Sequence, residues 1–339
     1  MNKPSAEKLL EIYRPMVASR YTDQLQSAAA QRGEVFFYIP SSGHEAAAAL
    51  APHLIDADWL HLHYRDRALA YARGVSYETV FYGLFSKQES NSAGRRMPAF
   101  PCDPSLNIMS TPTLVGSNVL QAVGVASVIK NEQGKPFVLV SVGDGATQQG
   151  DFFEAVAEAV RANLPVLFLI EDNRFALSTV TKGNTFYSLP DGDAESFYGL
   201  PIHRVDGSDA GPTYEKFGEV VSDLRKTRGP QIVVFNVERL ESHTNADDQS
   251  VYRTEADLKH AMDNADPCLR LRDRLLADGV EEGRITAIED EVKEQVDAAF
   301  HAARKGTTPK AALSAKKPLP KAREEYLGTP EDRTLSMLE

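Results

Sequence analysis

The chain has 339 residues, 42% hydrophobic and 25% charged, which suits a soluble globular protein with one large α/β domain or two small ones. Its net charge of −11 argues against general binding to nucleic acid or to an anionic membrane. No apolar run reaches the roughly 18 residues of a membrane span, and the two isolated cysteines indicate a reducing compartment without a zinc site.

The first predicted element is a helix over residues 6–30. Its apolar positions recur at helical spacing, so that one face would be buried. The extreme N-terminus has neither a continuous apolar core nor a small-residue cleavage site, which argues against a signal peptide. We therefore expect a cytoplasmic protein that begins with a helical segment, residues 1–34.

A second helix is predicted to begin at the turn SSGHEA and to end near Pro52. Ser42 and Glu45, three residues apart, match a capping box, in which the two side chains satisfy the first N–H groups of a helix. His44 lies between them and is a candidate for contact with a ligand. A water-exposed histidine at the start of a helix is an equal alternative.

Three stretches between positions 61 and 129 are candidates for ligand contacts. The first contains Tyr64 and Arg65; a guanidinium group matches phosphate oxygens, although a surface salt bridge is the more common fate of an arginine. The second, residues 84–109, looks irregular, and a loop of that length usually has a task or is mobile. The third, residues 110–129, is a Gly-punctuated loop that enters a helix, and residues 119–128 are assigned to the buried core.

The stretch from Phe137 to Thr179 predicts a βαβ unit. Apolar runs at residues 137–142 and 164–170 flank an amphipathic segment at about 152–162. Short apolar runs separated by such a helix are typical of parallel strands that are covered on both faces. The helix face that we expect to be buried consists of Phe153, Val156, Ala157 and Val160.

Asp144 and Asn173 each follow one of these two strands. Ligands of open parallel sheets bind at the carboxyl ends of the strands, and a right-handed crossover can bring these two side chains together. One carboxylate, neutral oxygens and substrate phosphates are the usual ligands of Mg²⁺. The glycines beside Asp144 would let backbone N–H groups approach a phosphate at the start of the next helix. The sequence thus predicts a magnesium and phosphate site.

The C-terminal half is predicted to continue the sheet and then to become helical. Asp206, which follows one of its strands, is assigned to turn chemistry. In the last helical region, Glu289 and Lys293 would form a supporting pair. The predicted elements are a short helix near 194–198, a strand at 202–205, a helix at 214–227, a strand at 231–236 and helices over 254–304 with the apolar stripe Ile285, Ile288, Val292, Val296, Ala299 and Ala303.

Together these elements predict an α/β fold with a doubly wound, mostly parallel sheet. Residues 35–304 would form the main domain, including its C-terminal helices. Residues 305–339 are polar, basic and punctuated by prolines, so we expect an extended tail or a linker to a partner.

The motifs around the βαβ unit resemble those of a known family. GDGATQQGDFFEA followed by EDNRFALST is similar to the thiamine diphosphate motif in the alpha subunit of the decarboxylating component of 2-oxo acid dehydrogenase complexes. That family includes enzymes for pyruvate, branched-chain 2-oxo acids and acetoin. SSGHEA, the Tyr64-Arg65 pair, GRRMP, and the His243 loop with Asp248 and Tyr252-Arg253 resemble it as well. The resemblance covers about residues 35–320 and implies the diphosphate-binding half of a thiamine diphosphate-binding fold.

The resemblance also implies roles for individual residues. Asp144, Asn173 and the backbone carbonyl of Phe175 would hold Mg²⁺. Arg65 and His243 would contact the diphosphate, and His243 would also act at the reaction centre, where a histidine can donate to a developing oxyanion. The other implied cofactor contacts are Tyr64, Thr113, Val115, Gly145 and Ala146.

The implied chemistry requires a partner. In this family a glutamate against the aminopyrimidine ring comes from the beta subunit, and no acidic residue here matches it. We therefore expect the chain to be inactive alone and to complete its site in an α2β2 heterotetramer or with a fused beta half. A lipoyl-bearing acyltransferase would accept the acyl group of a small 2-oxo acid, whose identity the sequence leaves open.

Several departures and alternatives stay open. Asp172 stands where relatives often carry Asn, and Phe100 where they often carry His. Thr244 occupies the place of a regulatory phosphoserine, and a potassium site reported for some relatives cannot be judged from Ser117 and Asn118. The alternatives are an acetoin dehydrogenase alpha subunit, a stand-alone transketolase-like enzyme, or a noncatalytic module that binds Mg²⁺ and a phosphorylated metabolite as a regulator.

Overall fold

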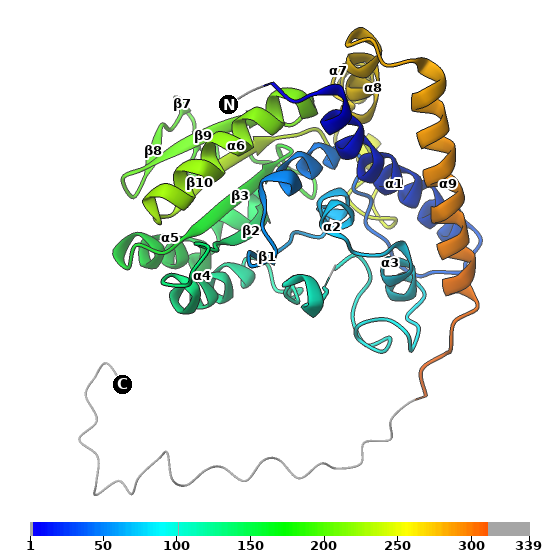
Figure 1. The fold of residues 1–339 in the computed structure, drawn as a ribbon, viewed down its shortest axis with the longest axis horizontal. Coiled ribbons are helices and arrows are strands. Elements are labelled where there is room, and N and C mark those ends of the chain that lie inside the picture. The colour runs from blue at the N-terminus through cyan, green and yellow to red at the C-terminus, as the bar shows by residue number, and fades with distance from the viewer. Residues whose placement is uncertain (1–2, 101, 311–339) are drawn as a thin grey trace, which may run out of the picture. The chain divides into compact units, whose positions relative to one another are not determined.

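A six-stranded sheet with the order β1-β2-β3-β10-β9-β8 organises the computed structural model, which describes residues 3–100 and 102–310 (Figure 1). The strands β1, β2, β3, β10 and β9 pair in parallel with their neighbours, and β8 joins β9 as an antiparallel edge strand. The predicted α/β class with a mostly parallel sheet is therefore confirmed. In sheet order, the strands are Trp59–His61, Val138–Gly143, Val166–Asp172, Gln231–Asn236, Leu200–Asp206 and Ser196–Phe197.

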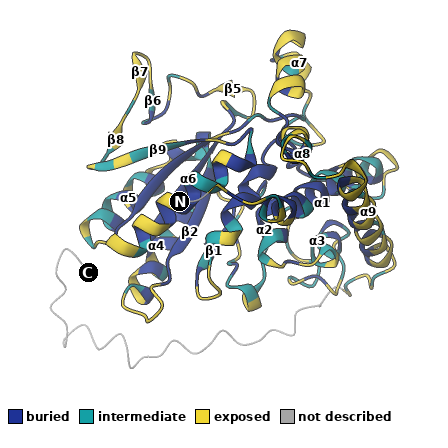
Figure 2. Cartoon of the chain, turned by 45° about the horizontal axis from the view of Figure 1, so that its top comes forward, coloured by how far each residue is buried: buried dark blue, intermediate teal, exposed yellow. Residues whose placement is uncertain are grey.

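Helices cover both faces of this sheet, because successive strand side chains point to opposite sides. Leu139 and Leu167 belong to one buried cluster, whereas their neighbours Val138 and Phe168 belong to the other. Figure 2 shows the central strands buried between these layers. Helices α4 (Asn118–Ile129) and α5 (Gly150–Arg161) pack on one side, while α1 (Ala6–Gln31), the 3-10 helix η1 (Glu45–His53), α2 (Arg67–Arg73) and α6 (Ala210–Thr227) pack on the other.

The N-terminal and C-terminal helices pack against each other. The described part of the chain also contains α3 (Tyr77–Leu84), η2 (Pro104–Leu106), α7 (Glu255–Asn264), α8 (Pro267–Ala277) and α9 (Glu282–Arg304). The predicted apolar stripe of α9 is buried throughout. Glu289 accepts from Tyr13 and Arg272 and so fastens α9 to α1 and α8, whereas we predicted that it would pair with Lys293. The part of the predicted tail that follows Lys310 lies outside the described residues.

Several local predictions were wrong. Residues 194–198 do not form a helix but enter the hairpin of β8 and β9, because Tyr198 and Gly199 both adopt positive φ angles, as a tight hairpin turn requires. The buried face of α5 is displaced from the predicted one, since Phe153 packs on Phe186 and Phe197 beside the sheet. The residues of α5 that are buried are Phe152, Ala155, Val156 and Ala159.

The prediction that Ser42 and Glu45 form a capping box was also wrong. Ser42 donates its hydroxyl to Asp23 and Glu241, and Glu45 accepts from the N–H of Gly43. The helix that follows is a 3-10 helix without a side-chain cap. Its first turn is held instead by long-range contacts that sequence spacing does not reveal.

Among the described residues, no helix is both long and apolar enough to cross a bilayer.

Candidate functional site

A cleft of about 490 Å³ opens at the carboxyl ends of β2 and β3. It brings together every predicted site residue except Arg65, although these residues come from five separate stretches of the chain. Arg65 is buried directly behind the wall of the cleft. The predicted residues that line the cleft are Tyr64, Thr113, Val115, Asp144, Gly145, Ala146, Asn173, Phe175 and His243.

Asp144 follows the last residue of β2 and is only 3% exposed. Its two carboxylate oxygens accept from the hydroxyl of Thr181 at 2.6 Å and from the N–H of Gly145 at 2.8 Å. Burial raises the pKa of Asp144 to about 6, and the nearby charge of Asp172 adds to the effect. A buried carboxylate without a cationic partner is costly, so this position favours a bound cation. We did not predict the contact of Thr181, which lies in a stretch that has the sequence pattern of a loop.

Gly145 also has a packing role that we did not predict. Its N–H is already bonded to Asp144, and a Cβ atom here would lie 2.5 Å from the Cβ of Ala176. The glycine therefore admits the hairpin of β4 (Phe175–Ala176) and β5 (Thr179–Val180) close to the end of β2. A short 3-10 helix, η3 (Asp144–Gln148), follows β2 directly, and α5 begins at Gly150, close to the predicted start near residue 152.

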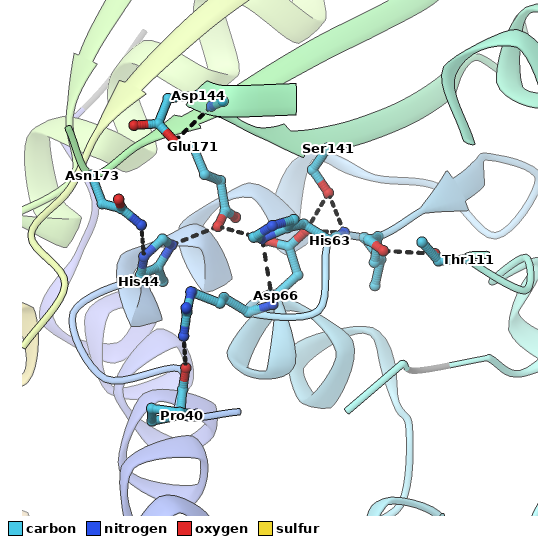
Figure 3. A network of polar contacts seen from close by, with 12 residues as sticks. Pro40, His44, His63, Asp66, Thr111, Ser141, Asp144, Glu171 and Asn173 are labelled. Atoms are coloured by element: carbon cyan, nitrogen blue, oxygen red, sulfur yellow. Dashed lines mark hydrogen bonds and ion pairs between the residues drawn. The ribbon is translucent and has the colours of Figure 1, made fainter. Parts of the chain in front are cut away.

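Asn173 follows the last residue of β3 and is held at both ends of its amide. Figure 3 shows its contact with His44. The oxygen accepts from the N–H of Phe175 at 3.1 Å, and the nitrogen lies 3.3 Å from Nε2 of His44. His44 is fully buried, which rules out the water-exposed alternative. The other ring nitrogen of His44, Nδ1, lies 2.5 Å from the carboxylate of Glu171.

Glu171 is the centre of a buried polar network that we did not predict. The same carboxylate oxygen also lies 3.2 Å from Nδ1 of His63. Within the described ranges, its other oxygen and Oδ1 of Asp66 are both buried without an ordinary hydrogen-bond partner. Burial and the charge of Glu171 raise the pKa of Asp66 well above its usual value, and a proton on Asp66 would give both oxygens a partner. Strand alternation could have revealed Glu171, because residues 171 and 173 lie on the same side of a strand.

Asp172, one of the departures from the family pattern, does not line the cleft. It accepts from the N–H of Arg174 at 2.9 Å and is only 9% exposed. Burial raises its pKa, and the neighbouring hydroxyl of Tyr187 works in the opposite direction. Its position follows from the alternation of β3, which turns it away from the side shared by Glu171 and Asn173.

Arg65 is 1% exposed, so the surface salt-bridge alternative is wrong. Its guanidinium group donates to Nδ1 and to the carbonyl oxygen of His243, at 3.0 Å each, and also to the carbonyl oxygen of Pro40. A guanidinium group can only donate, so Nδ1 of His243 carries no proton and Nε2 does. Burial lowers the pKa of His243 to about 3, and Arg65 and Arg239 contribute to this shift. His243 is thus a neutral ring that can donate through Nε2.

The loop that carries His243 is held by Asp247, although the resemblance pointed to Asp248. The carboxylate of Asp247 accepts from the N–H of His243 at 2.7 Å and from the hydroxyl of Tyr252 at 2.5 Å. Asp248 instead caps the short 3-10 helix η4 (Gln249–Val251). Arg239 donates to Tyr252 and to the carbonyl oxygen of Leu177, which ties this loop to the β4–β5 hairpin.

One wall of the cleft is apolar. Met97, Phe100, Leu114 and Leu177 line it. The ring of Phe100 meets that of Tyr64 edge to face at 5.9 Å, so the position where relatives often carry histidine here presents a hydrocarbon surface. Within the described residues no group of three or more His, Cys, Asp or Glu side chains is arranged to hold a metal. A cation at Asp144 would therefore rely on neutral oxygens and phosphate for its other ligands.

Comparison with known proteins agrees with this arrangement. The family model described as "Dehydrogenase E1 component" matches residues 13–312. The 2-oxoisovalerate dehydrogenase subunit alpha of Bacillus subtilis is 29% identical over 304 residues, which cover 87% of this chain and 92% of that protein. The pyruvate dehydrogenase E1 component subunit alpha of Staphylococcus epidermidis is 29% identical over 297 residues, covering 87% and 77%. The chain therefore belongs to the dehydrogenase E1 component family, which confirms its predicted identity as an alpha subunit of a thiamine diphosphate-dependent 2-oxo acid dehydrogenase.

Proposed function

We propose that this chain holds Mg²⁺ and thiamine diphosphate in the cleft at the carboxyl ends of β2 and β3 and, together with a beta subunit, decarboxylates a small 2-oxo acid. The observation that carries the proposal is the placement of Asp144 and Asn173 at the carboxyl ends of adjacent parallel strands, where they line one cleft. The helices on both faces of the sheet support the finer assignment as a doubly wound thiamine diphosphate-binding fold.

The residues of the cleft fit this cofactor. Asp144 supplies a single buried carboxylate, and Asn173 supplies an amide oxygen, which together with the carbonyl oxygen of Phe175 and phosphate oxygens make a hard ligand set suited to Mg²⁺. The volume of about 490 Å³ lies in the range of small-molecule sites. Leu114 and Val115 provide apolar surface for the rings of the cofactor.

The side chains of this chain would bind the cofactor, orient one another and donate hydrogen bonds. When bound, thiamine diphosphate supplies the electron sink that lets a 2-oxo acid lose CO₂. Arg65 holds His243 in the tautomer with a proton on Nε2. Because burial keeps the His243 ring neutral by lowering its pKa to about 3, the ring is a fixed donor near neutral pH, for a phosphate oxygen or a developing oxyanion.

A beta subunit would complete the site. Asp144 is the sole acidic side chain among the described residues that line the cleft, and its carboxylate is committed to the cation. The carboxylate that the cofactor's aminopyrimidine requires would therefore come from a partner, in an α2β2 heterotetramer or as a fused beta half. Leu114 is 74% exposed and Val115 62% exposed at the cleft, as expected for residues that a partner covers.

We further propose that the assembly transfers the acyl group to a lipoyl-bearing acyltransferase and works in the cytoplasm. The unpaired state of Cys102 and Cys268 fits a reducing compartment. The relatives act on different substrates by name, 2-oxoisovalerate and pyruvate, so the identity of the 2-oxo acid is a matter for experiment.

The test combines the chain with its beta subunit, thiamine diphosphate and Mg²⁺, and follows CO₂ release and dye reduction over a panel of 2-oxo acids and acetoin. We expect turnover only when both chains are present. Turnover by this chain alone would indicate a stand-alone enzyme, and preference for acetoin would redirect the substrate assignment. Ligand binding without turnover under every condition would favour the regulatory module instead.

A further inference from the structure

The backbone places the His44 ring in the protein interior with little freedom. Gly43, the residue before it, has a φ of +100°, and a Cβ atom there would lie 1.7 Å from the carbonyl oxygen of Glu238. Only glycine fits this position. The N–H of His44 donates to the carbonyl oxygen of Ser41 at 3.0 Å, and the side chain is 0% exposed. The ring is therefore delivered to one place, behind the wall of the cleft.

The protonation of this ring follows from the contacts of Asn173. The N–H of Phe175 is a permanent donor and lies 3.1 Å from the amide oxygen, so the amide nitrogen must face His44. An amide nitrogen only donates, and Nε2 of His44 at 3.3 Å must therefore accept. The proton then resides on Nδ1, which donates to the carboxylate of Glu171 at 2.5 Å.

We propose that His44 is a positioning residue, which accepts from the amide nitrogen of Asn173 and thereby keeps the amide oxygen directed at the cation in the cleft. Glu171 acts one step further back, because it fixes the tautomer of His44. This inference rests on the proposed magnesium and thiamine diphosphate site and assigns the residues that hold its ligand in place.

The physical need for such a residue lies in the symmetry of an amide. The two ends of the Asn173 side chain have almost the same shape, and a rotation of half a turn would present the NH₂ group to the cation. In that orientation the oxygen would face the lone pair of His44, and the nitrogen would face the N–H of Phe175. Both contacts would be repulsive, so the protein admits one orientation only. Groups that orient metal ligands in this way typically change metal affinity about 10- to 100-fold when they are removed.

The test replaces His44 in two matched ways in the assembled enzyme. His44→Gln keeps an acceptor for Asn173 and a donor for Glu171, whereas His44→Met fills the space without either group. Mg²⁺ is titrated in the presence of thiamine diphosphate by calorimetry. We expect His44→Met to weaken Mg²⁺ binding about 10- to 100-fold and His44→Gln to stay within about threefold of the wild type. A role in packing alone would affect both variants alike and would overturn the proposal.

Asp144→Ala in the same titration separates this inference from the proposed function. If Asp144→Ala loses Mg²⁺ and His44→Met does not, the site stands and the role of His44 is refuted; if Asp144→Ala binds normally, the site itself is refuted. If His44→Met fails to assemble, the proposal can be tested on the unmodified enzyme by measuring the tautomer of His44. The ¹⁵N shifts of the His44 ring, assigned by their loss in His44→Gln, should show a protonated Nδ1 and a bare Nε2, and the reverse would overturn the proposal.

Discussion

Arg65 donates to both Nδ1 and the carbonyl oxygen of His243, each at 3.0 Å, from a side chain that is 1% exposed. The contact links two segments that lie 178 positions apart in the chain. It sets the ring's tautomer and the position of its backbone at once. The geometry makes the planar guanidinium group, and not its charge alone, the property that matters.

Arg65→Lys should therefore impair the enzyme although it keeps the charge. The guanidinium group uses Nη2 for His243 and Nη1 for the carbonyl oxygen of Pro40. The single nitrogen of a lysine cannot hold both of these residues in a fixed fork, so we expect kcat/KM to fall about 100-fold, of the size seen when one oriented donor is lost. Steady-state kinetics on the assembled enzyme measure this effect. Arg73→Lys, at the end of α2, is a matched control outside the cleft and should leave kcat/KM unchanged. Equal kinetics for Arg65→Lys and the wild type would contradict the role of the fork.

The predicted magnesium ligand can be tested without changing its shape. Asp144→Asn replaces the carboxylate by an amide. We expect Mg²⁺ affinity in the presence of thiamine diphosphate to fall about 100-fold, because Asp144 is the only acidic side chain that lines the cleft in the described part of the chain. Thr181→Val removes a single hydrogen bond to Asp144 and should weaken binding by no more than about tenfold. A larger effect from Thr181→Val than from Asp144→Asn would show that the cation is bound elsewhere.

His61 should make the fold sensitive to acid. The ring is completely buried, neither of its nitrogens has a hydrogen-bond partner among the described residues, and burial lowers its pKa from 6.5 to about 4. Below pH 6.5 His61 binds a proton in the unfolded chain but not in the folded chain. The contribution of the neutral ring to the free energy of unfolding is therefore fully present above pH 6.5 and is lost as the pH falls toward 4. The loss between pH 7 and pH 5 amounts to about 2 kcal/mol.

His61→Leu removes this titration. Chemical denaturation at pH 7 and pH 5 should show a smaller loss of unfolding free energy in the variant than in the wild type. His44, His63 and His243 have lowered pKa values as well, so part of the acid sensitivity should persist. An identical loss of stability in the variant and the wild type would refute the role of His61.

Two glycines offer a paired test of close packing. A methyl group on Gly145 would meet Ala176 at 2.5 Å, so Gly145→Ala should cost about 1–3 kcal/mol and displace the β4–β5 hairpin. Gly124 lies inside α4, where no atom of another described element comes within 4 Å of an added Cβ atom. Gly124→Ala should therefore stabilise the chain by about 0.5–1 kcal/mol. Thermal unfolding measures both effects. Equal Tm shifts for the two variants would argue against the close contact.

Phe100 is expected to influence the choice of substrate. It forms part of the apolar wall beside Tyr64. Phe100→Ala removes hydrocarbon surface, so kcat/KM should fall more for 2-oxo acids with large apolar side chains than for pyruvate, by about 10- to 100-fold in the ratio. A uniform loss over the substrate panel would show that Phe100 supports the fold and does not touch the substrate.

Periodic segments with strong patterns were predictable from sequence. The β2-α5-β3 unit and the stripe of α9 follow from short repeats of apolar residues, and the line-up of Asp144 with Asn173 follows from the rule for parallel strands. The burial of His44 was not predictable, because its partner Glu171 lies 127 positions away. Thr181 was missed for a different reason: its contact with Asp144 depends on a hairpin of two-residue strands, which leaves little periodic signal in the sequence.

The alternation along β3 has a consequence for folding. A pairing error of one residue would exchange the two sides of this strand, so that Asp172 would stand where Asn173 now meets the cleft and Glu171 would lose both histidines. Because β3 pairs with β2 on one side and with β10 on the other, such a slip would disrupt the hydrogen bonds of two strand pairs at once. The central position of β3 thus protects the accuracy of the proposed metal site during assembly of the sheet.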